Sequence, residues 1–235
     1  MAARMEQKQK ELYHAHAQRL ALMLQNQTEE EFADSRFQVL SELTRLRQLC
    51  CDPALVYENY EGGSAKLDLC IELIQSAVES GHKILLFSQF TSMIEILTAR
   101  LQEESISCFV LQGSTKKEQR AQMVEQFNRD DTSVFCISLK AGGTGLNLTG
   151  ADIVIHYDPW WNVAVENQAT DRAHRIGQKN VVTVYKLIAK GTIEEKIIKL
   201  QQMKKELAEE ILSGDEIKTA SFQREELLEL LEEWF

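Results

Sequence analysis

Short apolar runs alternate with segments of helical pattern between residues 83 and 188, and this alternation constrains the fold more than any other feature of the sequence. The runs cover residues 83–88, 107–112, 133–138, 152–157 and 181–188. Chains that alternate strands and helices in this way form a mainly parallel sheet covered by helices on both faces. We therefore predict an α/β fold, in which ligands meet the loops at the carboxyl ends of the strands.

Helical patterns precede the alternating region. Thr28 and Glu31 have the spacing of a capping box, and Pro53 stops the pattern because the residue before a proline leaves the helical region. Apolar residues recur near the helical period at Phe32, Leu40, Leu43, Leu46 and Leu49. We predict a helical extension over residues 1–60, followed by a glycine-containing loop.

The α/β region is predicted to cover residues 61–190, and packing helices are predicted over residues 191–235. Within the α/β region, two helices are expected to begin at capping boxes whose first residues are Ser92 and Thr115, each followed three positions later by glutamate. The predicted architecture is therefore one α/β lobe with helical extensions at both ends.

Composition excludes several classes of protein. Hydrophobic residues make up 44% and charged residues 26% of the 235 residues, as in an ordinary globular protein. The sequence has no apolar run of about twenty residues and no apolar segment near its start, so we expect neither a transmembrane helix nor a secretory signal. We expect a cytoplasmic, nucleoid-associated or nuclear protein. Five cysteines without a Cys-x-x-Cys spacing indicate reduced core residues and no metal site.

The negative charge is unevenly distributed along the chain. The whole chain has a net charge of −10, but residues 113–190 contain eight acidic and ten basic residues, a balance of +2. A surface for nucleic acid could lie in this region, because binding follows local rather than overall charge.

A glycine-rich segment, "KAGGTGLNL" at residues 140–148, follows the predicted strand 133–138. Closely spaced glycines let backbone amides approach an anion, although a tight turn with positive φ explains them equally well. The next segment favours the anion, because Gln168, Arg172 and Arg175 share one face of a predicted helix. The adjacent apolar stripe, which would pack this helix on the sheet, is Val165, Ala169, Ala173 and Ile176.

The sequence contains no complete site for a nucleoside triphosphate. It has no Gly-Lys dipeptide, which a P-loop requires, and Leu148 stands where a dinucleotide fingerprint needs its third glycine. The pair Asp215 and Glu216 follows a helix rather than a strand, which is a poor context for binding Mg²⁺. The chain is therefore not expected to hold a triphosphate and its metal by itself.

The segments "SLKAGGTGLNLTGADIVIHYDPWWN" and "QATDRAHRIGQ" resemble motifs V and VI of the Swi/Snf family of superfamily-two helicases. The resemblance covers roughly residues 40–200 and includes "LTRLRQLCCDPAL", "SAKLDLCIELI", "GHKILLFSQFTSMIEIL" and "GTIEEKI". One departure is Val163, where the family commonly has proline. The family has two RecA-like lobes with ATP between them, and the first lobe carries the P-loop. This chain resembles the second lobe alone, which implies an N-terminal RecA-like ATPase lobe as its partner.

The resemblance also implies roles for single residues. Arg172 and Arg175 resemble the catalytic arginines that reach the ATP phosphates across the cleft. Gln168 resembles a glutamine that links nucleotide and lobe. The motif V positions that couple the ribose-phosphate region to DNA are Gly143, Gly145 and Asn147. ATP and Mg²⁺ are expected in the two-lobe enzyme, and no bound cofactor is expected in this chain alone.

Double-stranded DNA is the second expected partner, bound through its backbone without sequence preference. Amides and hydroxyls can hold a phosphate where a strand ends and a helix begins, and the sequence has two such places. The candidate DNA-binding residues are Ser88, Gln89, Thr91, Ser92, Gly113, Ser114, Thr115, Lys116, Lys117, Lys140, Thr144 and either Trp160 or Trp161. For either tryptophan a core role is at least as well supported. The alternative function is a stand-alone module that binds DNA or a protein without turnover, and no membrane partner is expected.

Overall fold

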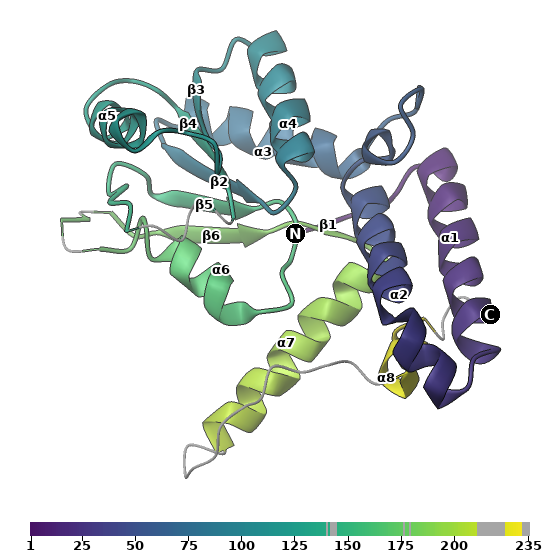
Figure 1. Cartoon of the computed structure of the whole chain (residues 1–235). Helices are drawn as coiled ribbons and strands as arrows, with labels where there is room; N and C mark the ends of the chain where they lie inside the picture. Colours follow the sequence, from purple (N-terminus) through teal and green to yellow (C-terminus); the bar gives the residue numbers. More distant parts are fainter. Residues whose placement is uncertain (140, 142–144, 176, 179, 211–223, 232–235) are drawn as a thin grey trace. The chain divides into compact units, whose positions relative to one another are not determined.

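The computed structural model describes residues 1–139, 141, 145–175, 177–178, 180–210 and 224–231 (Figure 1). The chain divides into two compact units. An α/β unit consists of residues 1–3 and 65–188, and a helical unit consists of residues 4–64 and 189–235.

The α/β unit contains a five-stranded parallel sheet with the strand order β3-β4-β2-β5-β6. Its strands are β2 (Ile84–Ser88), β3 (Cys108–Leu111), β4 (Val134–Ser138), β5 (Ile153–His156) and β6 (Thr183–Lys186). Each strand lies within one of the predicted apolar runs, so the prediction of a parallel sheet is confirmed. Every residue of β2, β4 and β5 is buried, because helices cover both faces. A further pairing joins β1 (Ala2–Ala3) to β7 (Ile188–Ala189).

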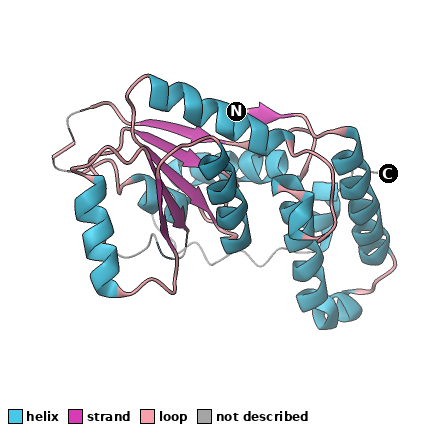
Figure 2. Cartoon of the chain, turned by 90° about the horizontal axis from the view of Figure 1, so that it is seen from above, coloured by secondary structure: helices cyan, strands magenta, loops and turns pink. Residues whose placement is uncertain are grey.

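The helices of the α/β unit are α3 (Ala65–Glu79), α4 (Thr91–Glu103), α5 (Lys117–Phe127) and α6 (Val163–Thr170). Helices α4 and α6 lie on opposite faces of the sheet (Figure 1), and helices lie on both sides of the strands when the chain is seen from above (Figure 2). On the face of α5 and α6, strand residues Leu85, Phe87 and Val154 form one apolar cluster with Phe127 and Ala169 of these helices. Because all five strands are parallel, their carboxyl ends lie at the same edge of the sheet.

The helical unit consists of α1 (Gln7–Gln25), α2 (Glu29–Cys51), the short 3₁₀ helix η1 (Pro53–Leu55), α7 (Ile193–Glu210) and α8 (Arg224–Leu231). The capping box of α2 is confirmed, since the Thr28 hydroxyl accepts the N–H of Glu31 at 3.3 Å and Glu31 Oε2 accepts the N–H of Thr28 at 2.8 Å. Helix α2 ends at Cys51, two residues before the proline, as predicted. The predicted apolar pattern of α2 is wrong at Leu40, which is 57% exposed.

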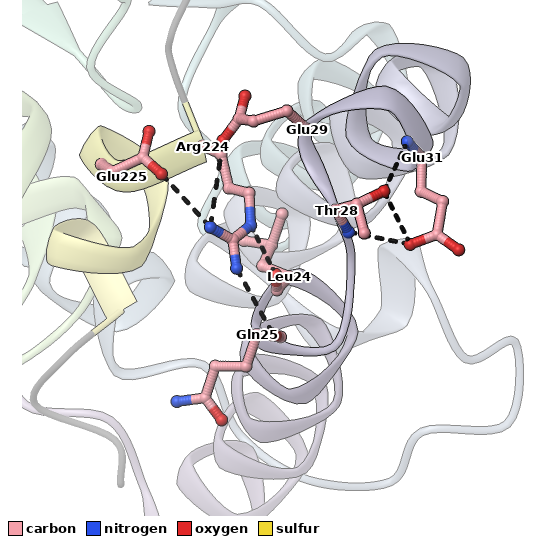
Figure 3. Close-up of polar contacts among 7 residues, drawn as sticks. All are labelled: Leu24, Gln25, Thr28, Glu29, Glu31, Arg224 and Glu225. Carbon is pink, nitrogen blue, oxygen red and sulfur yellow. Dashed lines mark hydrogen bonds and ion pairs between the residues drawn. The ribbon is translucent and has the colours of Figure 1, made fainter.

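Arg224, the first residue of α8, contacts the carboxyl end of α1 (Figure 3). Its Nε donates to the carbonyl of Leu24 at 2.8 Å, and its Nη2 donates to the carbonyl of Gln25 at 3.3 Å. Its Nη1 also pairs with the carboxylates of Glu29, at 4.0 Å, and Glu225, at 3.2 Å. The last carbonyls of a helix have no partner within the helix, so Arg224 caps α1 from the far end of the sequence.

Two predicted capping boxes of the α/β unit are wrong. Helix α4 begins at Thr91, one residue before the predicted cap Ser92, and α5 begins at Lys117. Neither start has a hydrogen bond from a capping side chain. The hydroxyl of Thr115 instead accepts the backbone N–H of Gln112 at 3.1 Å, because the turn before α5 folds back on itself.

Candidate functional site

The glycine-rich loop that follows β4 meets the segment that follows α6 at the carboxyl edge of the sheet. The backbone N–H of Leu148 donates to the carbonyl of Arg172 at 3.0 Å, and Arg175 Nη1 donates to the carbonyl of Gly145 at 3.4 Å. The structure thereby brings together the two segments that the sequence singles out. The loop candidates Lys140, Gly143 and Thr144 lie outside the described residues.

Gly145 and Asn128 determine the backbone conformation of the described part of this loop. Gly145 has a φ of +47°, a conformation that is strained for a residue with a Cβ even though the space around it is open. The Asn128 side chain donates to the carbonyl of Asn147 at 2.8 Å and accepts the N–H of Gly150 at 2.9 Å. The side chain of Asn147 is exposed. The backbone of the loop is therefore fixed from one side, while its outer side faces solvent.

The helix predicted to carry both arginines ends before it reaches them. Helix α6 stops at Thr170, and the N–H groups of Arg172 and Ala173 bond to carbonyls three residues back, as in a 3₁₀ turn. The prediction of one helix that presents Gln168, Arg172 and Arg175 on a single face is wrong, because α6 ends before the arginines and Arg172 is buried whereas Gln168 and Arg175 are exposed. Hydrogen bonds to the glycine loop, rather than helical periodicity, bring the arginine segment to the site. Gln168 is exposed within α6.

The two arginines have different environments. Arg172 is 3% exposed, and its Nε has no hydrogen-bond partner among the described residues. Burial lowers the pKa of Arg172, and the nearby charge of Arg175 lowers it further. Arg175 is exposed, and its Nε donates to the carbonyl of Asp171 at 3.2 Å. A buried cation with an unused donor beside a second cation is a favourable place for an anion, because the anion offsets both the burial and the repulsion.

The first predicted strand-to-helix site, between β2 and α4, already contains a carboxylate of the same unit. Ser88 is 1% exposed, and its hydroxyl donates to Asp158 Oδ1 at 2.6 Å. The backbone N–H of Gln89 donates to the same oxygen at 3.3 Å. Thr91 and Ser92 are exposed at the amino end of α4. The groups open to solvent at this place therefore belong to Thr91 and Ser92.

The second strand-to-helix site, between β3 and α5, is shaped by Arg120. Its guanidinium donates to the carbonyls of Thr115 at 2.8 Å, Gly113 at 3.0 Å and Gln112 at 3.2 Å. These three carbonyls therefore all accept hydrogen bonds from the Arg120 guanidinium near the start of α5. The residues of this turn that are exposed are Gly113, Ser114, Lys116 and Lys117. Lysines and a glycine amide on an exposed turn are suited to phosphate contacts.

Trp160 lies near the carboxyl edge of the sheet, where its ring packs and its backbone N–H forms a hydrogen bond. It is half-buried against the apolar cluster beneath α6, and its backbone N–H donates to Glu166 Oε1 at 2.6 Å. Glu166 is 1% exposed and pairs with Lys186 of β6. Trp161 is half-buried. The packing of Trp160 supports the core role for its ring.

Comparison with known proteins identifies the family. A family model described as the helicase conserved C-terminal domain matches residues 65–177. A putative ATP-dependent helicase/translocase of Bacillus subtilis is 45% identical over 184 residues, which are 75% of this chain and 20% of that protein. The solved Sulfolobus solfataricus SWI2/SNF2 ATPase C-terminal domain is 30% identical, with 98% of this chain and 95% of that chain covered and a TM-score of 0.78. The chain belongs to the SWI2/SNF2 family.

The match to nearly all of a solved C-terminal domain shows that the chain is the C-terminal lobe of a SWI2/SNF2 protein, as the resemblance implies. A structure of the Sulfolobus solfataricus SWI2/SNF2 ATPase core in complex with double-stranded DNA also matches, with 32% identity, a TM-score of 0.75 and coverage of 91% of this chain and 45% of that chain. The chain spans about a fifth of the length of three curated bacterial relatives that it matches. Within the part that the structure describes, no helix is long and apolar enough to cross a membrane.

Several polar residues that build this SWI2/SNF2 lobe have no signal in a single sequence. Asn128 and Asp158 bond to backbone groups of distant segments, and Arg120 and Glu166 bond to the turns that precede their own helices, so the residue types alone do not reveal these partners. The departure at Val163 has little consequence for the local structure. Val163 is the first residue of α6, where proline and valine are both accommodated, and the preceding Asn162 caps the helix.

Proposed function

We propose that this SWI2/SNF2 lobe supplies the second half of the ATP site in a longer, ATP-driven translocase on double-stranded DNA. The observation that carries the proposal is the pair of arginines held against the glycine loop, one of them buried with an Nε donor that has no partner among the described residues. The names of two similar proteins, an ATP-dependent helicase/translocase and an ATPase core in complex with double-stranded DNA, support the same function.

In this proposal Arg172 and Arg175 bind phosphate oxygens of a nucleotide that another lobe holds. Two guanidiniums at this place stabilise the negative charge of the transferred phosphoryl group, which lowers the barrier to hydrolysis. The residues proposed to face the nucleotide beside them are Gln168, Gly143, Gly145 and Asn147. ATP and Mg²⁺ are held by the N-terminal RecA-like lobe, because this sequence has no Gly-Lys dipeptide for a P-loop.

The DNA side of the proposal uses the two strand-to-helix turns. Thr91 and Ser92 offer exposed hydroxyls and helix amides at the first turn, while Ser88 and Gln89 support this turn from within. At the second turn the proposed contacts are Gly113, Ser114, Thr115, Lys116 and Lys117, and the glycine loop adds Lys140 and Thr144. The packing of the Trp160 ring leaves it at most an edge for a sugar or backbone contact. These contacts are to backbone, so binding is independent of base sequence.

The test is ATP hydrolysis by the longer protein with and without mixed-sequence duplex DNA, beside the 235-residue chain alone. We expect hydrolysis that DNA stimulates in the longer protein. We expect no turnover by the isolated chain, because it lacks the P-loop lysine and the acidic Mg²⁺ motif. Turnover by the pure isolated chain, in proportion to its concentration, would contradict the division of the site between two lobes.

A further inference from the structure

Asp158 is a buried carboxylate that neither the nucleotide site nor the DNA surface uses directly. It follows β5 by two positions and is 4% exposed. It accepts a 2.6 Å hydrogen bond from the Ser88 hydroxyl, and the N–H of Gln89 lies 3.3 and 3.4 Å from its two oxygens. A hydrogen bond from a hydroxyl to an ionised carboxylate at this distance is charge-assisted and strong. Asp158 therefore joins the carboxyl ends of two adjacent strands, β2 and β5.

On the β2 side, these contacts reach the amino end of α4. The Ser88 oxygen that donates to Asp158 also accepts the N–H of Phe90 at 3.2 Å. Phe90 is the residue before α4, and its own side chain makes no capping hydrogen bond. Asp158 and Ser88 thus take the place of a cap just behind the exposed Thr91. The helix start that is proposed to bind a DNA phosphate is anchored on Asp158.

On the β5 side, the same residue begins the loop that leads to α6 and the arginines. Two residues beyond Asp158, the N–H of Trp160 donates to Glu166 of α6 at 2.6 Å. Glu166 is buried and pairs with Lys186. The short loop between β5 and α6 is therefore fixed by a carboxylate near each end. Asp158 is thereby linked to this loop, and Glu166 links the loop to the helix that precedes the arginine turn.

We infer that Asp158 is a positioning residue that couples DNA binding at the amino end of α4 to the placement of Arg172 and Arg175. The inference rests on the proposed function. A phosphate arriving at Thr91 and Ser92 brings negative charge toward a buried carboxylate that bonds to the same turn, and charges interact strongly where water is excluded. The bonds of Asp158 to Ser88 and Gln89 then readjust, and the loop that carries Trp160 moves with them.

The competing explanation is that Asp158 only stabilises the fold. Asp152 is a matched control residue that tests this explanation. Asp152 lies at the other end of β5, is 8% exposed, and accepts hydrogen bonds from the N–H of Lys83 at 3.3 Å and from Asn180 Nδ2 at 3.1 Å. It also contacts His82 Nδ1 at 2.9 Å. The two carboxylates thus share a strand, similar burial and a bonded backbone amide, but they lie at opposite edges of the sheet.

The experiment compares Asp158→Asn with Asp152→Asn in the longer protein, using mixed-sequence duplex DNA as the probe. For Asp158→Asn we expect the ratio of DNA-stimulated to basal kcat to fall about tenfold, the scale of a lost hydrogen bond to a charged group, because the DNA-stimulated rate falls more than the basal rate. Asp152→Asn should lower the melting temperature at least as much and leave the ratio unchanged. An unchanged ratio in Asp158→Asn, or an equal loss in both rates, would overturn the inference.

A second measurement keeps the inference separate from the proposed function. Amide hydrogen exchange in the longer protein without DNA should quicken in Asp158→Asn at Gln89 and Phe90 and also at Trp160, whereas Asp152→Asn should affect Lys83. Exchange that quickens only on the β2 side would show that Asp158 does not link the two segments. If the wild-type protein shows no stimulation by DNA, the proposed function fails, and exchange at Trp160 still decides whether the link exists.

Discussion

Replacing Arg175 with alanine should test whether this residue acts in catalysis, because its side chain contributes little to the stability of the fold. The Arg175 side chain is exposed and donates two long hydrogen bonds, 3.2 Å to the carbonyl of Asp171 and 3.4 Å to the carbonyl of Gly145. Exposed hydrogen bonds of this length contribute little net stability. The expected loss is below about 1 kcal/mol, with a fall in melting temperature of no more than about 3 °C.

The effect on catalysis should be much larger than the effect on stability. Loss of the guanidinium removes charge stabilisation that acts mainly in the transition state, so kcat for DNA-stimulated hydrolysis should fall by about 100-fold or more, equivalent to about 2.7 kcal/mol. The Kd for ATP should change much less, because most ground-state contacts belong to the other lobe. Arg175→Lys should restore little activity, since lysine lacks the planar fork of arginine.

The assay measures kcat, the nucleotide Kd and the melting temperature of each variant in the longer protein. The control is Arg129→Ala, because Arg129 has a side chain that is 77% exposed and a salt bridge to Glu125 at 2.7 Å on the surface beyond α5. This control should leave all three quantities nearly unchanged. Near-normal turnover of Arg175→Ala with an unchanged melting temperature would refute the assignment and show that Arg175 is an exposed surface residue without a catalytic role.

Three further predictions concern the rest of the chain. Changing both Lys116 and Lys117 to alanine should weaken binding to unrelated DNA duplexes about equally and flatten the salt dependence, and a strong base preference would contradict this. Burial lowers the pKa of His156 to about 4 from an ordinary 6.5. The unfolded chain therefore takes up this proton first as the pH falls, so stability that is complete above pH 6.5 should decrease by up to about 3 kcal/mol between pH 6.5 and 4. Urea unfolding should show this slope in the wild type and lack it in His156→Gln. Arg224→Ala should cost about 1–2 kcal/mol of unfolding free energy, because it uncaps α1, and equal urea midpoints for variant and wild type would disprove the cap.

The sequence determined those features that depend on residues close together along the chain. The run "ILLFS" is apolar at four of five positions, which suits a strand buried on both faces, and the structure buries all of β2. Thr28 and Glu31 are one helical turn apart, so their capping box is specified by residues at the start of the helix itself. The missing P-loop and the motif V and VI segments are likewise properties of contiguous residues. The fold class and the family could therefore be predicted from these segments.

Tertiary structure decided the features in which distant groups compete for the same hydrogen bond. Helical periodicity extends α6 through both arginines, but the carbonyl of Arg172 bonds to Leu148, and the chain beyond Thr170 tightens into a turn. The hydroxyl of Ser88 is an apparent phosphate ligand in the sequence, yet it bonds to Asp158, seventy positions away. A local pattern records which donors and acceptors a segment offers. Only the folded chain determines which partner each of these groups bonds to. A buried polar group needs a hydrogen bond, and tertiary packing decides which donor or acceptor lies within about 3 Å of it.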